Sequence, residues 1–130
     1  MEMKREAIRT SGAPAAIGPY SQAVRLGPWV FLSGQIALEP ASGALVEGDA
    51  SVQIERALEN AGAVLRAAGA GFDHVVRTTL YLRDMADFEA VNRVYARYFP
   101  APPPARSTVQ AAALPRGAAV EIELTAYCER

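Results

Sequence analysis

The segment His74-Val-Val-Arg-Thr-Thr-Leu-Tyr-Leu-Arg83 alternates along its length and lies between two segments with helical spacing. In an extended strand every second side chain points to the same face. One face of the predicted strand therefore carries Val76, Thr78, Leu80 and Leu82, and the other carries Val75, Arg77, Thr79 and Tyr81. A strand between two helices is typical of proteins in which helices cover a sheet.

Residues 49–68 have the spacing of a helix that precedes this strand. Asp49 or Ser51 can cap its N-terminus, because a short polar side chain accepts hydrogen bonds from the free backbone amides there. Gly69 or Gly71 would end it. The apolar positions of this helix are Ile54, Ala57, Leu58, Ala61, Val64, Leu65 and Ala68.

A second helix is predicted after Asp84, which offers another N-cap, and it stops at Pro100. The segment 101–105, Ala-Pro-Pro-Pro-Ala, is stiff because proline fixes φ and restricts the residue before it. This segment leads through Arg106 into a strand over residues 107–113. The apolar side of the second helix carries Phe88, Val91, Val94, Tyr95 and Tyr98.

Shorter strand-like segments complete a sheet, and their ranges are 4–10, 21–26, 29–33 and 119–127. The order is therefore β-β-β-α-β-α-β-β. This order predicts a single α+β domain over residues 1–130, with two helices covering one face of a single sheet. On the last strand apolar side chains alternate with Glu121, Glu123 and Thr125, so the second face of the sheet is suited to an oligomer contact.

Composition disfavours several classes of protein. Lys plus Arg number 13 against 14 for Asp plus Glu, and no basic run offers a stripe for phosphates, so we expect no nucleic-acid partner. Residues 1–9 lack an apolar core, and no apolar run approaches the roughly 18 residues of a membrane span, so we expect a cytoplasmic protein without membrane contacts. With one Cys and one His, structural zinc is excluded, whereas a carboxylate-only magnesium site is not.

Arg106 and Glu121 are the residues best suited to chemistry. The planar guanidinium of Arg106 can grip a carboxylate with two hydrogen bonds, and the rigid segment before it lowers the entropy lost on binding. Arg106 is therefore either a carboxylate anchor or a surface arginine paired with an acid. Glu121 lies on a strand whose other face is core, so it is either a partly buried acid or base or a solvated strand residue.

Other candidates carry weaker signals. Tyr20, after Ile17-Gly-Pro19, either points into a pocket or closes a turn. Asn92 interrupts the apolar side of the second helix and would ordinarily make a helix-to-loop hydrogen bond. Ser33-Gly34 closes a strand, where glycine most simply relieves crowding in a bulge. A Ser/His/Asp triad would need His74 as its base, and the sequence has no nucleophile elbow.

Four blocks in the same order resemble the RidA family, also called the YjgF family, over nearly the whole chain. The blocks are Ala15-Ala-Ile-Gly-Pro-Tyr-Ser-Gln22, Leu32-Ser-Gly-Gln-Ile36, Phe88-Glu-Ala-Val-Asn92 and Pro104-Ala-Arg-Ser-Thr-Val109. The last block is followed by Leu114 and then by Val120-Glu-Ile122 at the spacing of the family signature.

This resemblance implies a chorismate-mutase-like α+β fold and a homotrimer whose sheets form a central barrel, with active sites between subunits. It also implies hydrolysis of enamines such as 2-aminoacrylate, or of their imine tautomers, to 2-keto acids and ammonia, without a metal or organic cofactor. By position, Arg106 would bind the substrate carboxylate and Glu121 would orient or activate water, with Glu123 in reserve. The pocket would be completed by Tyr20, Asn92 and backbone groups near Ser33, Gly34 and Thr108.

Thr108 departs from the family pattern, because many bacterial relatives carry Cys at this position. The implied role of the position rests mainly on the backbone carbonyl, which Thr retains. A thiol-dependent modification or redox response is impossible at Thr108.

Two other functions stay open. A non-enzymatic sensor could bind 2-keto acids through Arg106, although a pure binder has no evident need for Glu121. An endoribonuclease or translation inhibitor would use basic side chains around a phosphate, and the sequence has neither a basic stripe nor a second His. The sequence does not determine which imine is the substrate, because side chains from different subunits would shape the pocket.

Overall fold

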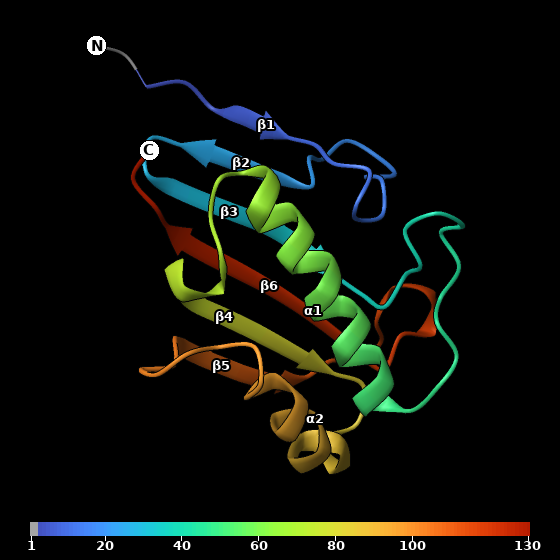
Figure 1. Cartoon of the computed structure of the whole chain (residues 1–130). Helices are drawn as coiled ribbons and strands as arrows, with labels where there is room; N and C mark the ends of the chain where they lie inside the picture. Colours follow the sequence, from blue (N-terminus) through green and yellow to red (C-terminus); the bar gives the residue numbers. More distant parts are fainter. Residues whose placement is uncertain (1–2) are drawn as a thin grey trace.

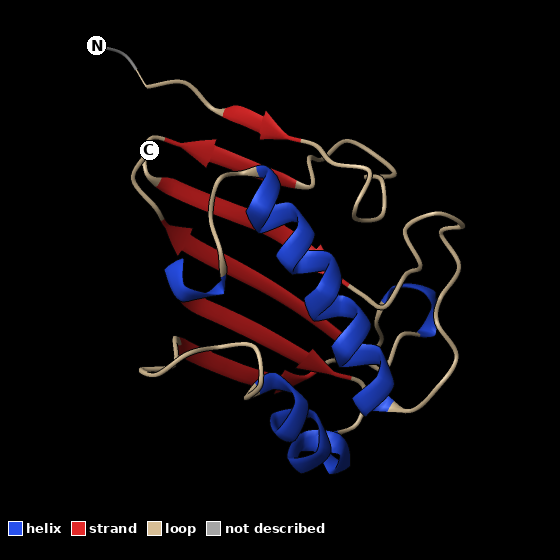
Figure 2. Ribbon diagram, in the orientation of Figure 1, coloured by secondary structure: helices blue, strands red, loops and turns tan. Residues whose placement is uncertain are grey.

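Residues 3–130, which the computed structural model describes, form one sheet of six strands with two α-helices on the same face (Figures 1 and 2). The strands are β1 (Glu6–Ile8), β2 (Ala23–Leu26), β3 (Trp29–Gln35), β4 (Val75–Leu82), β5 (Ala105–Gln110) and β6 (Val120–Tyr127). The helices are α1 (Ala50–Ala67) and α2 (Phe88–Tyr95). The strand order is β1-β2-β3-β6-β4-β5, and β4 and β5 are the parallel pair in an otherwise antiparallel sheet. The predicted α+β class and single sheet are confirmed.

α1 begins and ends at two of the predicted capping residues. The Asp49 carboxylate accepts a hydrogen bond from the Val52 amide at 3.1 Å, so Asp49 and not Ser51 is the N-cap. Gly69 follows the C-cap Ala68 and has a φ of 83°, a conformation that glycine adopts easily because it has no Cβ. The predicted apolar side of this helix is buried against the sheet and α2.

α2 is shorter than the sequence predicted. The turn Met85–Asp87 is a 3-10 helix, and Asp84 caps this turn rather than α2 itself. α2 then ends at Tyr95 instead of Pro100, because the backbone amides of the next turn bond to carbonyls three residues back and tighten the chain. The predicted apolar side is nonetheless the side that packs against the core.

The start of β4 departs from simple alternation. Val75 is buried, with 7% of its surface exposed, whereas Val76 is 44% exposed. The prediction that Val76 shares a face with Thr78, Leu80 and Leu82 is therefore wrong. The pairing with β6 shifts between Val75 and Arg77, so one extra residue bulges out of the ladder. Beyond the bulge the predicted alternation is correct, and the face that carries Thr78, Leu80 and Leu82 is buried.

Other strand boundaries differ from the prediction at the edges of the sheet. β1 covers three residues of the predicted 4–10, because the Thr10 amide bonds to the Gln22 side chain instead of to a neighbouring strand. β5 begins at Ala105, which pairs with Arg77 of β4, and it ends at Gln110. Arg106 therefore lies within a strand and has a fixed orientation relative to the sheet.

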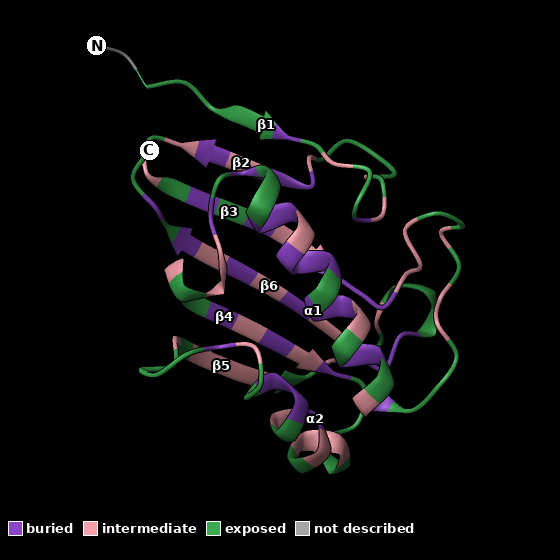
Figure 3. Cartoon of the chain, in the orientation of Figure 1, coloured by how far each residue is buried: buried purple, intermediate pink, exposed green. Residues whose placement is uncertain are grey.

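The two faces of the sheet have different surroundings. The helix-covered face is the core, and the buried residues of β6 alternate with partly exposed ones (Figure 3). We call the second face the open face, since both α-helices lie on the other side (Figure 1). It exposes Trp29, Phe31 and Tyr127, and the centroid of the Trp29 ring lies 6.4 Å from that of Phe31 and 4.9 Å from that of Tyr127. This apolar exposure leaves the second face suited to contact with another protein surface.

Candidate functional site

A pocket of about 650 Å³ lies where β3 and β6 meet the loops around them. Its lining combines apolar side chains with several residues singled out from the sequence. Those residues are Tyr20, Ser33, Gly34, Glu121 and Glu123. We call the first four of these, without Glu123, the Glu121 half of the candidate site.

Glu121 faces this pocket because β6 alternates. Val120 and Ile122 on either side of it are fully buried in the core, so the Glu121 side chain points to the open face. Its burial, and next the negative charge of nearby Glu123, raise the pKa of the Glu121 carboxyl above its ordinary value. A carboxyl with a raised pKa is a stronger proton acceptor, and because its pKa lies closer to neutral pH it is better suited to both taking and returning a proton.

Gly34 lies directly beside the Glu121 carboxylate. The pairing of β3 with β6 shifts between Leu32 and Gln35, so Ser33 and Gly34 form the bulge that the glycine suggested. A Cβ atom at position 34 would collide with the Glu121 carboxylate. The Ser33 hydroxyl donates a 2.6 Å hydrogen bond to the Ser21 carbonyl, which ties the bulge to the preceding loop.

Tyr20 belongs to a loop that is organised by a buried amide. The Gln22 side chain is 4% exposed, accepts a 2.7 Å hydrogen bond from the Thr10 amide and donates one of 2.8 Å to the Pro14 carbonyl. Tyr20 itself is 53% exposed and lines the pocket from the outside. Sequence analysis did not single out Gln22, although a polar residue just before a strand is a signal of this kind of loop anchor.

Arg106 lies in a second cluster, formed by β5 and α2. Its Nη2 donates a 2.8 Å hydrogen bond to Oδ1 of Asn92. Its guanidinium carbon lies 4.6 Å from the ring centroid of Tyr95 and 5.6 Å from that of Phe88. We call Asn92, Arg106 and Thr108 the Arg106 half of the site. Asn92 therefore contacts Arg106 itself, and Phe88 and Tyr95 are contacts that the sequence did not reveal.

The two halves lie on opposite faces of the sheet. Arg106 is in register with Thr78, which is buried under the helices and bonds to Tyr95. Glu121 is in register with Tyr81, which points to the open face and donates a hydrogen bond to Glu123. Thr108, two residues beyond Arg106, shares the helix-covered face. The strand β4 separates the two halves, so one chain does not bring Arg106 and Glu121 together.

Residues 3–130 hold neither a membrane-spanning helix nor a cluster of metal-binding side chains. None of the helices in this range is long and apolar enough to cross a membrane. Within the same range no three His, Cys, Asp or Glu side chains are grouped so that they could hold a metal ion. Among the described residues, Glu121 and Glu123 therefore have no third His, Cys, Asp or Glu side chain grouped with them.

Comparison with known proteins places the chain in a family. The family model described as "Endoribonuclease L-PSP" matches residues 10–128. Protein DfrA of Myxococcus xanthus is 56% identical over 126 residues, which are 95% of this chain and 96% of that protein. The mouse protein named 2-iminobutanoate/2-iminopropanoate deaminase is 52% identical over 122 residues, which are 94% of this chain and 90% of that protein.

A solved structure agrees with this assignment. The crystal structure of RidA from an Antarctic Psychrobacter bacterium superposes with a TM-score of 0.91 at 43% identity, and the match covers 94% of this chain and 98% of that one. The resemblance to RidA proteins is therefore confirmed in both sequence and fold. The chain belongs to the Endoribonuclease L-PSP family, which includes RidA and the 2-iminobutanoate/2-iminopropanoate deaminases.

Proposed function

We propose that this protein is a deaminase that hydrolyses imines or enamines derived from amino acids, such as 2-aminoacrylate, to 2-keto acids and ammonia. The observation that carries this proposal is the Glu121 carboxyl, whose pKa is raised in a pocket where Gly34 leaves room for it. The mouse relative that carries the deaminase name supports the same reaction.

In the proposed reaction Glu121 moves one proton twice. A water molecule attacks C2 of the protonated imine, and Glu121 takes a proton from this water as the C–O bond forms. Glu121 returns this proton to the nitrogen, the C–N bond breaks, and the nitrogen leaves with the remaining hydroxyl proton as ammonium. A protonated imine is already electrophilic, so positioning and one proton acceptor are sufficient and no cofactor takes part.

Arg106 holds the substrate carboxylate in this proposal, and a second copy of the chain supplies it. The separation of the two halves by the sheet supports this, because an Arg106 half could meet the Glu121 half of a neighbour. We infer a homotrimer in which the open faces form a central barrel, and the exposed aromatic rings on that face support such a contact. Tyr20, Ser33, Gly34, Asn92 and Thr108 would surround the substrate, and the cytoplasm remains the compartment we propose.

The test is the release of 2-keto acid from 2-aminoacrylate that a serine dehydratase generates in the same cuvette. The wild-type protein should accelerate release over the spontaneous rate, and Arg106→Ala should not. Arg93→Ala is the matched control, because Arg93 is an exposed arginine one residue from Asn92. It should behave as wild type.

Measurements of pyruvate binding and of RNA cleavage by the same variants separate the alternative functions. Binding of pyruvate without any acceleration would contradict the deaminase and favour the 2-keto-acid sensor. Cleavage of RNA that Arg106→Ala abolishes would favour the activity in the family description.

A further inference from the structure

The guanidinium of Arg106 lies on an aromatic surface. The Tyr95 ring centroid is 4.6 Å from its central carbon and the Phe88 centroid is 5.6 Å away. A cation over a ring face at these distances is attracted by the ring quadrupole. A ring in this position takes up none of the N–H donors of the guanidinium, so they remain available to bind a ligand.

The hydrogen bonds of Arg106 leave donors available. Nη2 donates to Asn92 at 2.8 Å, while Nε and Nη1 have no partner among residues 3–130. The Arg106 side chain is thus held by Asn92 and by the two aromatic rings, while its Nε and Nη1 donors are available to a ligand. This arrangement fits a carboxylate anchor whose orientation is fixed before the ligand arrives.

Tyr95 is itself held firmly beneath Arg106. It is 7% exposed, and its hydroxyl shares a 2.8 Å hydrogen bond with the hydroxyl of Thr78, which is 1% exposed. The ring of Phe99 packs against Tyr95 with a centroid distance of 4.4 Å. Because Thr78 lies in register with Arg106 on the neighbouring strand, the same β4–β5 pairing positions both the arginine and the anchor of its ring.

We propose that Tyr95, anchored by Thr78, is a positioning residue that orients the Arg106 guanidinium for carboxylate binding. This proposal rests on the function proposed above. An arginine that is free to rotate loses this freedom when it binds, whereas a stacked arginine has already lost it. Removal of the ring should therefore weaken substrate binding more than it slows the chemical step.

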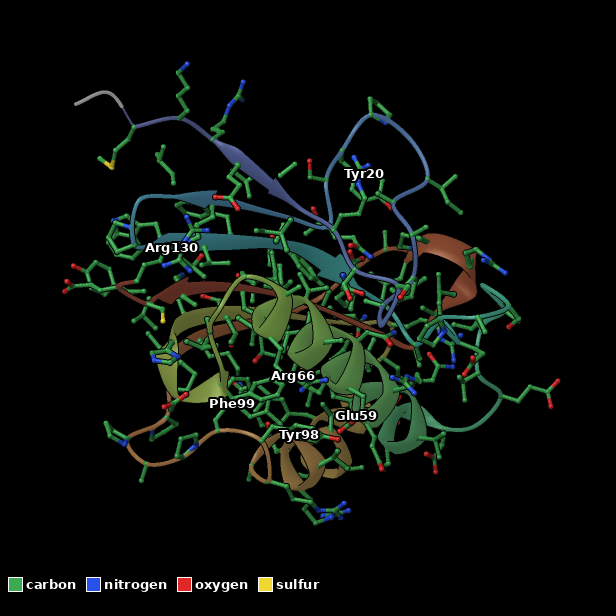
Figure 4. All side chains as sticks on the ribbon, turned by 45° about the horizontal axis from the view of Figure 1, so that its top comes forward. Tyr20, Glu59, Arg66, Tyr98, Phe99 and Arg130 are labelled. Carbon is green, nitrogen blue, oxygen red and sulfur yellow. The ribbon has the colours of Figure 1, made fainter. Side chains whose placement is uncertain are left out.

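The experiment compares Tyr95→Leu and Tyr95→Phe with a matched pair at Tyr98. The Tyr98 hydroxyl also makes a hydrogen bond, which it donates to the Glu59 carboxylate of α1 at 2.7 Å, and both side chains are labelled in Figure 4. The rings that lie near the Arg106 guanidinium are those of Tyr95 and Phe88. Tyr95→Leu should raise KM for the imine about 3- to 30-fold, the range expected for a lost cation–π contact, with a smaller change in kcat. Tyr95→Phe keeps the ring and should restore most of the affinity. Tyr98→Leu and Tyr98→Phe should leave KM unchanged.

A second readout does not depend on the reaction. Crystal structures of the wild type and Tyr95→Leu should show Arg106 stacked in the first and turned or disordered in the second. Arg106 in an unchanged position in Tyr95→Leu would overturn the proposal whatever the assay gives. If the wild type shows no deamination, the dissociation constant for pyruvate replaces KM, so a failed deaminase assay does not decide this question.

Loss of a buried ring can also unfold the protein, so a conservative pair of variants provides a further test. Tyr95→Phe and Thr78→Val remove the same hydrogen bond from its two ends. Each should raise KM by about two- to threefold, and the double variant should add little, because residues that share one interaction are not additive. Unchanged KM in both single variants would overturn the role of Thr78 as the anchor.

Discussion

The Glu121 half and the Arg106 half of the candidate site are built in different ways. The Glu121 half combines the bulge at Ser33 and Gly34 with a loop organised by Gln22, and it lies on the open face. The Arg106 half lies on the helix-covered face, where a strand and α2 fix the arginine between an amide and two rings. One half holds an acid whose charge is disfavoured, and the other holds a cation whose orientation is fixed. Each half supplies what the other lacks, and this favours a site shared between copies.

The largest expected effect is loss of turnover when Glu121 is changed. Glu121→Gln keeps the shape of the side chain and cannot accept a proton, so kcat should fall by about 100- to 10,000-fold. Pyruvate binding, which depends on Arg106, should change little, and calorimetry measures it. Unchanged kcat would move the proton transfer to another group, with Glu123 the first candidate.

Gly34→Ala tests the Glu121 half without removing its acid. The new Cβ would displace the Glu121 carboxylate, and a misplaced catalytic group can lower kcat by roughly 100-fold. Steady-state kinetics should show this loss mainly in kcat. If kcat stays at the wild-type value, the close contact between Gly34 and Glu121 has no role in the reaction.

Asn92→Ala tests the Arg106 half, where we expect the variant to change KM rather than kcat. It removes the 2.8 Å hydrogen bond to Nη2 and should raise KM by about 10-fold, with kcat affected less, because one hydrogen bond to a charged group contributes about 1.5 kcal/mol or more. Together, Gly34→Ala and Asn92→Ala should separate kcat from KM. If Gly34→Ala and Asn92→Ala changed the same kinetic parameter, the assignment of proton transfer to one half and substrate binding to the other would be wrong.

The smallest expected effect concerns stability and pH. A raised folded-state pKa means that ionised Glu121 weakens folding as the pH rises through that pKa, whereas below the unfolded-state pKa the penalty is absent. Glu121→Gln should therefore melt at a slightly higher temperature than the wild type at pH 7. The difference should vanish in acid, where both side chains are neutral. A lower melting temperature of the variant at pH 7 would contradict the burial of an ionised Glu121.

Local sequence patterns predicted much of the fold. The alternation of β6 correctly placed Glu121 opposite the core, and the glycine at position 34 correctly indicated a bulge. The bulge at Val76 was missed because two adjacent valines satisfy either register equally well. The end of α2 was missed because no proline or glycine stands between Tyr95 and Pro100 to mark the tighter turns.

The division of the site was harder to predict from local patterns. It depends on which strand pairs with β5 and in what register, since this pairing places Arg106 level with Thr78 under the helices. Such pairing joins residues far apart in the chain and leaves no periodic signal near Arg106. For the same reason the contact between Tyr95 and Arg106 was not predicted, because the helical spacing of Tyr95 indicated only a core residue.

A mixing experiment tests the shared site most directly. Arg106→Ala and Glu121→Gln are each expected to be inactive, and the two are unfolded together and refolded as a mixture, with native mass spectrometry to verify mixed assemblies. If each site takes Arg106 from one copy and Glu121 from another, random mixing in equal amounts restores about one quarter of the sites. Deaminase activity near one quarter of the wild-type value is the predicted result. Mixed assemblies that remain inactive would contradict a site shared between copies.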